Sequence, residues 1–589
     1  MNLITLLKQT TSASLDSLYQ VKIQPEQVLV NATKPEFEGD YTIVLFAFVK
    51  QLGKNPEVVG NELGNAMQKA LPTIITEFNI VKGFLNFTIS NDYWFEFIKN
   101  LSPNELMPAV EHKRKIMVEY SSPNTNKPLH LGHLRNNFLG WSIAEILKLQ
   151  GHEVVKTCIV NDRGIHICKS MIAWQLFANG ATPESTHKKG DHFVGDYYVK
   201  YNDAYKAEVA ELVAGGMMQE MAEKEAPILK GAQEMLLKWE QGDAATLDLW
   251  KKMNSWVYEG FEVTYKKIGS DFFKTYYESN TYLLGKELVE EGLTKKVFYQ
   301  KEDSSVWIDL TPDGLDEKIV RRKDGTSVYM TQDIGLAQLK QKEFNADASI
   351  YVVGDEQNYH FKVLKLICQK LEQPAADGIY HLSYGMVELP TGKMKSREGT
   401  VVDADDLVDE MINISKEKTE ALGKVSDFTS EQLIALYNTI GLGALKFFLL
   451  RVDPKKKMIF NPEESIDFHG FTGPFIQYTH ARIKSILRKT GTTVDLTNNE
   501  LLPLEKQLAI ELSTFPAMVN EAAENLDPSK IAIYAFNLAK LFNTFYAEHS
   551  ISNAESEIKK QLRIQLGILT AATLQKAMSA LGIAVPEQM

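Results

Sequence analysis

IMVEYSSPNTNKPLHLGHLR, residues 116–135, reads as a strand, a polar turn and the first turn of a helix. Residues 116–120 have the pattern of a short buried strand, and a helical pattern runs from about Leu134 to Gln150, where Gly151 ends it. Residues 154–160 read as the next strand. Strand, helix and strand make a βαβ unit, which predicts an α/β fold built on a parallel sheet.

The turn in this unit carries the residues that we expect to bind a ligand. Ligands of an open parallel sheet bind beyond the carboxyl ends of its strands. Here that edge leads into a helix N-terminus, whose N–H groups and dipole favour phosphate. His130 and His133 lie three residues apart, so both imidazoles can face one phosphate chain. Gly132 lets a ligand approach the backbone, and Lys127 and Arg135 add positive charge.

These residues fit the attack of a carboxylate on the α-phosphate of ATP. Such a site works by positioning its reactants and by stabilising charge on the transferring phosphoryl group. The alternative is that the histidines bind zinc or pack in the core. Zinc requires further His, Cys or carboxylate ligands at ordinary spacing, and the sequence offers no convincing set. We therefore expect ATP, Mg²⁺ accompanying the ATP, and no zinc.

A second candidate site, GMVELPTGKMKSREGT at residues 385–400, combines lysine and arginine with flanking glycines. This composition is typical of a flexible loop that closes cations over a triphosphate. It also describes a solvated basic turn. The dihistidine turn on the same α/β part favours the phosphate interpretation.

The chain of 589 residues is too long for one core. We predict an N-terminal α+β domain over residues 1–110 and an α/β domain over 111–400 with a helical insertion at about 190–267. A helical connector over 401–455 and a separate all-helical domain over 456–589 follow. Pro/Asn/Asp breaks at 452–462, 495–503 and 526–528 separate the helices of the last part.

The bulk composition narrows the class of protein. Hydrophobic residues make up 44% and charged residues 24%, which excludes general disorder. The three cysteines are too few for a disulfide framework and fit a reducing compartment. We find no secretory signal and no apolar stretch of roughly 20 residues that could span a bilayer. We therefore expect a cytoplasmic protein without a membrane partner.

The net charge of −12 argues against bulk electrostatic binding of nucleic acid, but it leaves room for a local basic surface. Two runs of cations are candidates, Arg321-Arg322-Lys323 and Lys455-Lys456-Lys457. A run of this length is more often a solvated loop than an RNA-binding surface.

Together, the His-x-Gly-His element and the Lys-Met-Lys-Ser-Arg loop resemble the two signatures of class I aminoacyl-tRNA synthetases. The surrounding residues resemble the arginyl-tRNA synthetase family over the whole chain, including its closing residues 581–587. The loop departs from the class pattern, because Lys395 stands where serine is usual and Arg397 where the last lysine is usual. In the family, the position of Lys127 shares the phosphate role.

This resemblance implies a Rossmann-type catalytic domain and assigns site residues by position. The catalytic set is His130, His133, Lys127, Lys395 and Arg397. The ATP-binding set is Pro123, Asn124, Leu131, Gly132, Gly354, Asp355, His360, Met386, Val387, Lys393, Met394 and Ser396. The arginine-binding set is Glu119, Ser121, Asn124, Tyr329, Asp333 and Gln357. Arg163 stands where the family more usually has tryptophan, and His166 nearby is expected to be structural.

The chemistry of arginine agrees with part of this assignment. A guanidinium group is planar and always charged, so its pocket should contain a carboxylate and a flat or amide partner. Tyr329 and Asp333 are one helical turn apart and can share a face. As bare residues they would more often be a surface pair.

The resemblance also implies parts that face tRNA. The N-terminal domain resembles the family's extra domain, which touches the outer corner of tRNA, and the helical C-terminus resembles its anticodon-binding bundle. Gln477, Tyr478 and Arg482 are the expected tRNA contacts, although a packing role for Phe475 and Tyr478 is the simpler reading. The implied partners are L-arginine and its tRNA, with no DNA, and we expect a monomer.

The implied reaction joins arginine and ATP into arginyl-adenylate and then transfers arginine to the tRNA 3′ end. Two alternatives remain. One is another nucleotidylyl transferase, such as the cysteine enzyme of the same class or a cofactor adenylyltransferase. The other is a non-catalytic RNA-binding relative, which we would expect to lack His130, His133 or Asp333, all of which are present.

Overall fold

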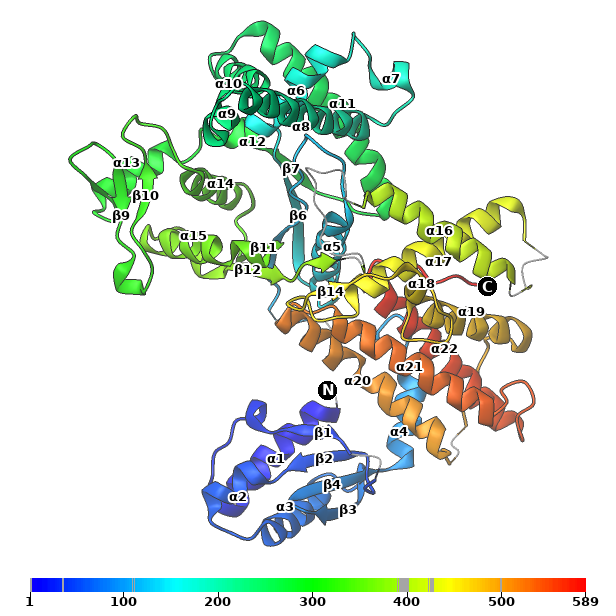
Figure 1. Ribbon diagram of the computed structural model, residues 1–589. Coiled ribbons are helices and arrows are strands. Elements are labelled where there is room, and N and C mark those ends of the chain that lie inside the picture. The colour runs from blue at the N-terminus through cyan, green and yellow to red at the C-terminus, as the bar shows by residue number, and fades with distance from the viewer. Residues whose placement is uncertain are drawn as a thin grey trace.

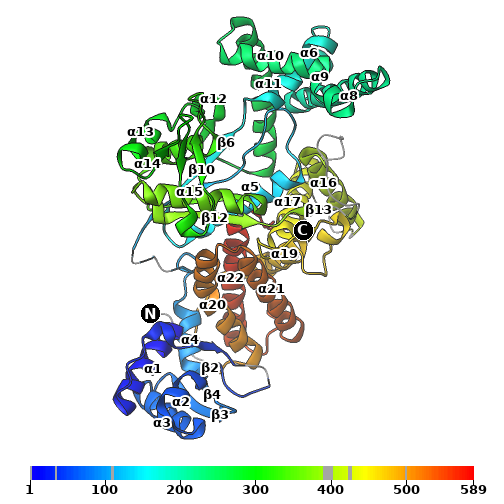
Figure 2. The ribbon, with the colours of Figure 1, turned by 60° about the vertical axis from the view of Figure 1, so that its left-hand side comes forward.

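The computed structural model describes residues 3–33, 36–107, 110, 112–388, 390, 402–421, 423, 428–497 and 500–589. Its elements form three parts in chain order: an α+β unit, an α/β part around a parallel sheet, and a helical part (Figure 1). This is the predicted fold class. In both ribbon views the C-terminal helices lie between the N-terminal unit and the parallel sheet (Figures 1 and 2).

The N-terminal unit is an antiparallel sheet of order β1-β2-β4-β3 covered by helices. Its strands are β1 (Val30–Ala32), β2 (Tyr41–Val44), β3 (Ile75–Val81) and β4 (Phe84–Ile89). Its helices are α1 (Leu3–Tyr19), η1 (Pro25–Gln27), α2 (Phe46–Leu52), α3 (Pro56–Ala70) and α4 (Asn91–Asn100). A Cβ added at Gly64 would lie 2.5 Å from the Phe78 ring, so the absence of a side chain there lets α3 pack directly on the sheet.

The central sheet has the order β12-β11-β5-β6-β7, and every pair in it is parallel. Its strands are β5 (Lys115–Glu119), β6 (Glu153–Val160), β7 (Lys274–Tyr277), β11 (Ala348–Gly354) and β12 (Ile379–Tyr384). The predicted βαβ unit is confirmed as β5, α5 (Leu131–Leu149) and β6. The strand order reverses between β5 and β11, and such a reversal opens a crevice for ligands.

Long connections separate the later strands of this sheet. Between β6 and β7 lie α6 (Ile165–Phe177), α7 (Pro183–Thr186), α8 (Gly190–Ala214), α9 (Gln219–Glu225), α10 (Pro227–Glu240) and α11 (Ala244–Ile268). Between β7 and β11 lie α12 (Glu278–Thr281), α13 (Lys286–Thr294), an antiparallel sheet of β8 (Tyr299–Gln300), β9 (Val306–Ile308) and β10 (Lys318–Arg321), η2 (Thr311–Asp313) and α14 (Tyr329–Phe344). The helices of the first connection therefore begin at Ile165, before residue 190, where the sequence predicted the start of the helical insertion.

The chain then crosses into the helical part. After β11 come η3 (Asp355–Gln357), α15 (Asn358–Lys370) and η4 (Ala376–Gly378), and after β12 comes β13 (Val387–Glu388). The remaining elements are α16 (Ala404–Ala421), α17 (Ser430–Leu450), β14 (Met458–Ile459), α18 (Pro462–Ser465), α19 (Gly473–Thr490), α20 (Pro503–Asn525), α21 (Ser529–Glu548) and α22 (Glu557–Ala580). β13 and β14 pair in parallel, which ties the sheet to the helical part.

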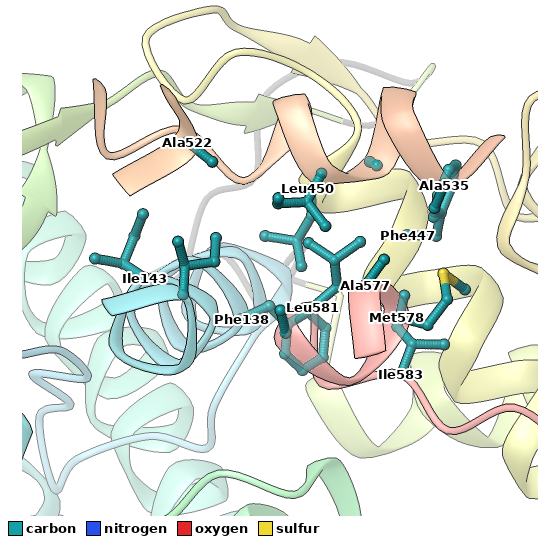
Figure 3. Packing of buried hydrophobic residues seen from close by; sticks show 14 of the residues in the cluster. Phe138, Ile143, Phe447, Leu450, Ala522, Ala535, Ala577, Met578, Leu581 and Ile583 are labelled. Carbon is teal, nitrogen blue, oxygen red and sulfur yellow. The ribbon is translucent and has the colours of Figure 1, made fainter. Parts of the chain in front are cut away.

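One hydrophobic core joins the helical part to the α/β part. Helices α17, α20 and α22 all contact α5. Figure 3 shows Phe138 and Ile143 of α5 facing Leu450 of α17 and Leu581 just after α22. Ser142 of α5 also donates to the Ala580 carbonyl over 2.8 Å. The helix that begins at the dihistidine turn is thus packed against the C-terminal helices.

The expectation that no apolar segment reaches membrane-spanning length is wrong. Among the described residues, α17 is long and apolar enough to cross a membrane by composition. It is mostly buried inside the protein, against α5, α16 and α19. A core helix of a large domain has the same composition, because it is hydrophobic on most of its faces.

Candidate active site

The ends of β5 and β11 form the floor of the candidate site. β5 ends at Glu119 and β11 at Gly354, on either side of the reversal in strand order. A side chain added at Gly354 would meet nothing within 4 Å. The backbone there is therefore open to a ligand that comes close to the strand end.

The polar turn after β5 is held by bonds to β6 and α5. Ser121 is buried and adopts a left-handed backbone with φ +61°. Its N–H donates to Asn136 Oδ1 over 2.6 Å, and its hydroxyl shares a 2.7 Å hydrogen bond with the Tyr265 hydroxyl. Asn161 donates its N–H to the Pro123 carbonyl over 2.9 Å, and the neighbouring Asn124 is exposed. Ser121 is thus occupied by the protein's own network, whereas Asn124 faces solvent.

His130 and His133 both accept backbone N–H groups at the start of α5 through Nδ1. Nδ1 of His130 accepts the Gly132 N–H over 3.1 Å, and Nδ1 of His133 accepts the His130 N–H over 3.1 Å. An imidazole that accepts through Nδ1 carries its proton on Nε2 when neutral. Both rings therefore offer an Nε2–H donor, with ring centres 3.9 Å apart.

The surroundings of the two histidines keep them neutral. Burial, with the charge of Lys127, lowers the pKa of His130 to about 3. Burial, His130 and Lys127 lower the pKa of His133 well below its usual range. The pair can therefore donate hydrogen bonds to an anion at neutral pH without first losing a proton.

Lys127 and Arg135, the two cations close to the histidines in sequence, have different surroundings. Lys127 and His130 line one side of a cavity of about 220 Å³. Arg135 is buried and donates to the carbonyl oxygens of Pro454 and Lys456 over 3.1 and 2.8 Å. Arg135 therefore joins α5 to the segment before β14 and does not face the ligand.

The predicted basic loop lies between two anchored ends. Residues 391–401, and with them Lys393, Met394, Lys395, Ser396 and Arg397, lie outside the described residues. Before them, Val387 is buried in β13 and Met386 is exposed. After them, Val402 accepts the Leu131 N–H over 3.2 Å, and Asp403 pairs with His130. The chain therefore re-emerges beside the dihistidine turn.

Glu119, predicted to bind arginine, is paired inside the protein. Its buried carboxylate forms an ion pair with Lys340 of α14 and accepts a 3.4 Å hydrogen bond from Thr157. This buried pair bridges β5, β6 and α14. Glu119 therefore lies at the floor of the candidate site and is already ion-paired with Lys340.

Tyr329 and Asp333 lie on the first turns of α14, as predicted. Tyr329 is 71% exposed and lines a cavity of about 430 Å³ together with Arg163 and Tyr282. Asp333 Oδ2 accepts a hydrogen bond from His360 Nε2 over 2.7 Å. The structure thus brings together a residue expected to bind arginine and one expected near ATP. Gln357, in η3 after β11, is exposed.

Glu278, at the carboxyl end of β7, was not predicted from the sequence. Burial raises its pKa to about 7; Asp162 and Asp333 also raise the pKa, and Arg163 lowers it. Its neighbour Ser279 donates to the Asp162 carboxylate through N–H and hydroxyl over 2.8 and 2.7 Å, which ties β7 to β6. The sequence signal that could have identified Glu278 is its position directly after KTYY, residues 274–277, a run typical of a strand.

Arg163, the departure from the family pattern, lies against aromatic rings. Its guanidinium carbon lies 4.1 Å from the Tyr282 ring centre and 5.2 Å from that of Trp239, and it pairs with Glu240 over 3.1 Å. A planar cation can replace an aromatic ring in such a stack. His166 bonds the Tyr198 hydroxyl over 3.1 Å, which agrees with its structural assignment.

The structure corrects one of the predicted tRNA contacts. Gln477 is completely buried and donates to the carbonyls of Thr439 and Ala584 over 3.0 and 2.8 Å. It holds α17 and the C-terminal tail to α19, and a side chain in this position has no surface to offer. Tyr478 and Arg482 are half-buried, with the Arg482 guanidinium carbon 4.8 Å from the Tyr478 ring centre.

Three protein-family models match the chain. The class I tRNA synthetase (R) catalytic domain matches residues 98–461, the DALR anticodon binding domain matches 476–589, and the arginyl tRNA synthetase N terminal domain matches 3–89. The DALR match begins within the first turn of α19 and covers α20 to α22, and the catalytic match covers the whole parallel sheet.

Individual proteins are similar over the full length. The arginine–tRNA ligase of Flavobacterium psychrophilum is 51% identical, with 100% of both chains covered, and that of Bacteroides thetaiotaomicron is 52% identical, with 98% of both covered. The solved Thermus thermophilus arginyl-tRNA synthetase has the same fold, with a TM-score of 0.82 at 24% identity over 100% of both chains. The chain therefore belongs to the family of class I arginyl-tRNA synthetases, the arginine–tRNA ligases.

Proposed function

We propose that the dihistidine turn binds the phosphates of ATP while the carboxylate of arginine attacks the α-phosphate. The reaction is that of the family: arginyl-adenylate and pyrophosphate form first, and arginine then passes to the 3′ end of tRNA. The observation that carries the assignment is the pair of neutral Nε2–H donors at the α5 N-terminus. Donors held in place before the reaction stabilise charge that develops on the phosphoryl oxygens.

ATP would lie across the reversal in strand order. Gly132 at the helix start and Gly354 and Asp355 at the end of β11 flank this reversal, and Leu131, whose side chain is buried, would contribute through its backbone only. Lys127 would neutralise phosphate from the side of the 220 Å³ cavity. Lys393 to Arg397 would approach from the segment whose ends lie at β13 and beside His130. Val387 is buried, so it would contribute through its backbone only.

Arginine would bind between α14, β5 and β7. Asp333 and Glu278 supply two carboxylates on neighbouring elements; burial chiefly raises the pKa of Glu278, and repulsion from Asp333 adds to it. A guanidinium placed between them would relieve that repulsion. Tyr329 supplies a flat face, and Asn124 and Gln357 are accessible amides for the α-amino end.

Magnesium would arrive with ATP, coordinated by its phosphates. Among the described residues, one group could jointly coordinate an ion, Asp191, His192 and Asp405. The ammonium of Lys189 already lies 3.0 Å from Asp191 and 2.6 Å from Asp405, so this group does not fit a resident metal ion. We propose no zinc site, and we propose that the enzyme is a cytoplasmic monomer.

The test of the assignment is the charging of a mixed tRNA pool with separately labelled amino acids. The full-length protein should attach arginine in an ATP-dependent reaction and should not attach lysine or cysteine. A protein with alanine at both His130 and His133 controls for contaminating synthetases. Attachment of a different amino acid, or arginine charging that persists in the double variant, would overturn the proposal.

We also propose that adenylate formation depends on bound tRNA. The helix that carries the dihistidine turn packs against α17, α20 and α22, so a shift of the helical part on tRNA binding would reach the turn. Tyr478 and Arg482, half-buried on α19, would contact the tRNA. Pyrophosphate exchange that runs at full rate without tRNA would contradict this dependence.

A further inference from the structure

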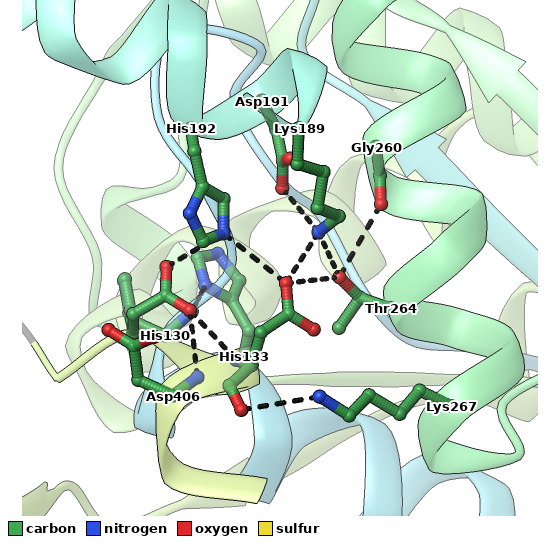
Figure 4. A network of polar contacts seen from close by, with 11 residues as sticks. His130, His133, Lys189, Asp191, His192, Gly260, Thr264, Lys267 and Asp406 are labelled. Atoms are coloured by element: carbon green, nitrogen blue, oxygen red, sulfur yellow. Dashed lines mark hydrogen bonds and ion pairs between the residues drawn. The ribbon is translucent and has the colours of Figure 1, made fainter. Parts of the chain in front are cut away.

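A network of charged side chains joins the helices between β6 and β7 to the start of α16 (Figure 4). The Lys189 ammonium lies 3.0 Å from Asp191 Oδ2, 2.5 Å from the Thr264 hydroxyl and 2.6 Å from Asp405 Oδ2. Lys189 precedes α8, Thr264 lies on α11, and Asp405 lies on α16. Three elements that are distant in sequence therefore meet at one ammonium group.

His192 adds a second bridge across the same boundary. Its Nε2 lies 3.2 Å from Asp405 Oδ2 and 3.3 Å from Asp403 Oδ2. Lys267 of α11 reaches the Asp405 carbonyl over 3.4 Å and pairs with Asp409 over 2.7 Å. The residues around Asp405 are thus held by α8 and α11 at several points.

The same residues are bonded to the dihistidine turn on their other side. Asp403 pairs through its backbone with His130, and Ala404 donates its N–H to the Leu129 carbonyl over 3.0 Å. The Asp403 side chain caps α16 by accepting the Asp405 N–H over 2.8 Å. Residues 402–405 therefore connect the network directly to the proposed ATP site.

The network contains its own cation, the Lys189 ammonium. Asp191 Oδ1 and Asp405 Oδ1 have no hydrogen-bond partner among the described residues. Asp191 Oδ1 faces α11, where a Cβ added at Gly260 would lie 2.3 Å from it. The Lys189 ammonium lies between Asp191 and Asp405, where a cation would otherwise be needed. Lys189 pairs with Asp191 and Asp405, and His192 lies within ion-pair distance of Asp403 and Asp405.

We propose that Lys189 and His192 are positioning residues for adenylate formation, locking the helices between β6 and β7 to residues 402–405. These contacts hold His130 and residues 402–405 in one arrangement. The inference rests on the phosphate role proposed for His130. A displacement of about 1 Å at a reacting group can cost about 100-fold in rate, so loss of the lock should appear in kcat.

The lock has a titratable member, His192. On its own segment it faces Lys189 and Asp191, and from the start of α16 it faces Asp403 and Asp405. Asp196 lines the same cavity and is paired with Lys188. Lys127 and His130 border the cavity that it shares with the dihistidine turn. The hydrogen bond with Asp405 raises the pKa of His192, burial opposes this, and Asp403 and Asp191 raise it further. His192 therefore carries a positive charge below this raised pKa and loses it as the pH rises through the pKa. The loss weakens its contacts with Asp403 and Asp405.

The test uses His192→Gln and Lys189→Met in the full-length protein, with Lys188→Ala as the matched control. Lys188 is adjacent in sequence and forms an exposed ion pair with Asp196 over 2.5 Å. Pyrophosphate exchange is measured with arginine, ATP and tRNA, beside thermal unfolding. We expect kcat to fall at least tenfold in both variants, with KM for arginine within twofold, and no more than a twofold change in the control.

The pH profile separates positioning from mere structural support. The ratio of wild-type to His192→Gln kcat should be greatest near pH 6 and should fall toward pH 8.5. A ratio that is constant with pH, or kcat values within twofold of wild type, would overturn the proposal. If Lys189→Met does not fold, the His192→Gln profile decides alone. Failure of the wild-type protein to use arginine would instead refute the proposed function.

Discussion

Asp333→Asn is the sharpest probe of the arginine pocket, because it removes one charge and keeps the shape of the side chain. The amide oxygen of the new side chain can still accept the hydrogen bond that His360 Nε2 now gives to Asp333 over 2.7 Å. The variant therefore keeps the local structure of α14. What it would lose is the electrostatic attraction proposed between this carboxylate and the guanidinium of arginine.

The size of the loss follows from the exposure of the site. A hydrogen bond to a charged group contributes about 1.5–3 kcal/mol. The Asp333 side chain is 40% exposed, so solvent screens part of that interaction. We expect a loss of about 2 kcal/mol, equivalent to a roughly 30-fold fall in kcat/KM for arginine. KM for ATP should change by less than twofold.

The assay is tRNA charging with labelled arginine and ATP titrated in turn. Glu343→Gln is the matched control, because Glu343 is a carboxylate on the last turn of the same helix, ion-paired with Lys274 over 2.6 Å. It lies about 15 Å along the helix from Asp333, and its removal should leave KM for arginine within twofold. Equal losses for arginine and ATP, or equal effects in the two variants, would refute the assigned role.

Three further predictions concern the turn, the helical part and the interface between them. His133→Ala should lower kcat for pyrophosphate exchange about 100- to 1000-fold, with a loss of unfolding free energy of only about 1 kcal/mol from the missing cap; a small rate effect would contradict the donor role. Gln477→Ala should lower the melting temperature, because each buried carbonyl left without a donor costs about 1–3 kcal/mol. An increased KM for tRNA without a loss of stability would contradict the packing role of Gln477. Burial lowers the pKa of Lys446 from 10.5 to about 8, so between pH 8 and pH 10.5 the unfolded chain binds more protons than the folded protein. The free energy of urea unfolding of the wild type, relative to that of Lys446→Met, should therefore rise with pH in this range. A difference between the two proteins that does not change with pH would contradict the pKa shift.

Local signals in the sequence were sufficient for the centre of the fold. The strand and helix around the dihistidine turn and the strand at 154–160 all appear in the structure. The pairing of Tyr329 with Asp333 on one helix was also predicted, because a helix relates residues four apart whatever surrounds it.

The less predictable parts depend on distant segments. Glu278 lies beside the proposed site because β7 joins the sheet next to β6, far along the chain from β5. Gln477 looked available for RNA, and its burial follows from α17 and the C-terminal tail, which pack on α19. Periodicity within α19 gives no information on which partners cover which face.

The sequence by itself determined the kind of chemistry. Two histidines, a glycine and a helix start within a few residues have their mutual geometry set by the backbone, since the Nδ1 atoms bond N–H groups of the same turn. Only the tertiary structure decided which carboxylates lie near Asp333, which amides are buried, and that Lys189 and His192 reach residues 402–405. Those relations join residues many positions apart, and they arise from the packing of whole elements, which no local pattern encodes.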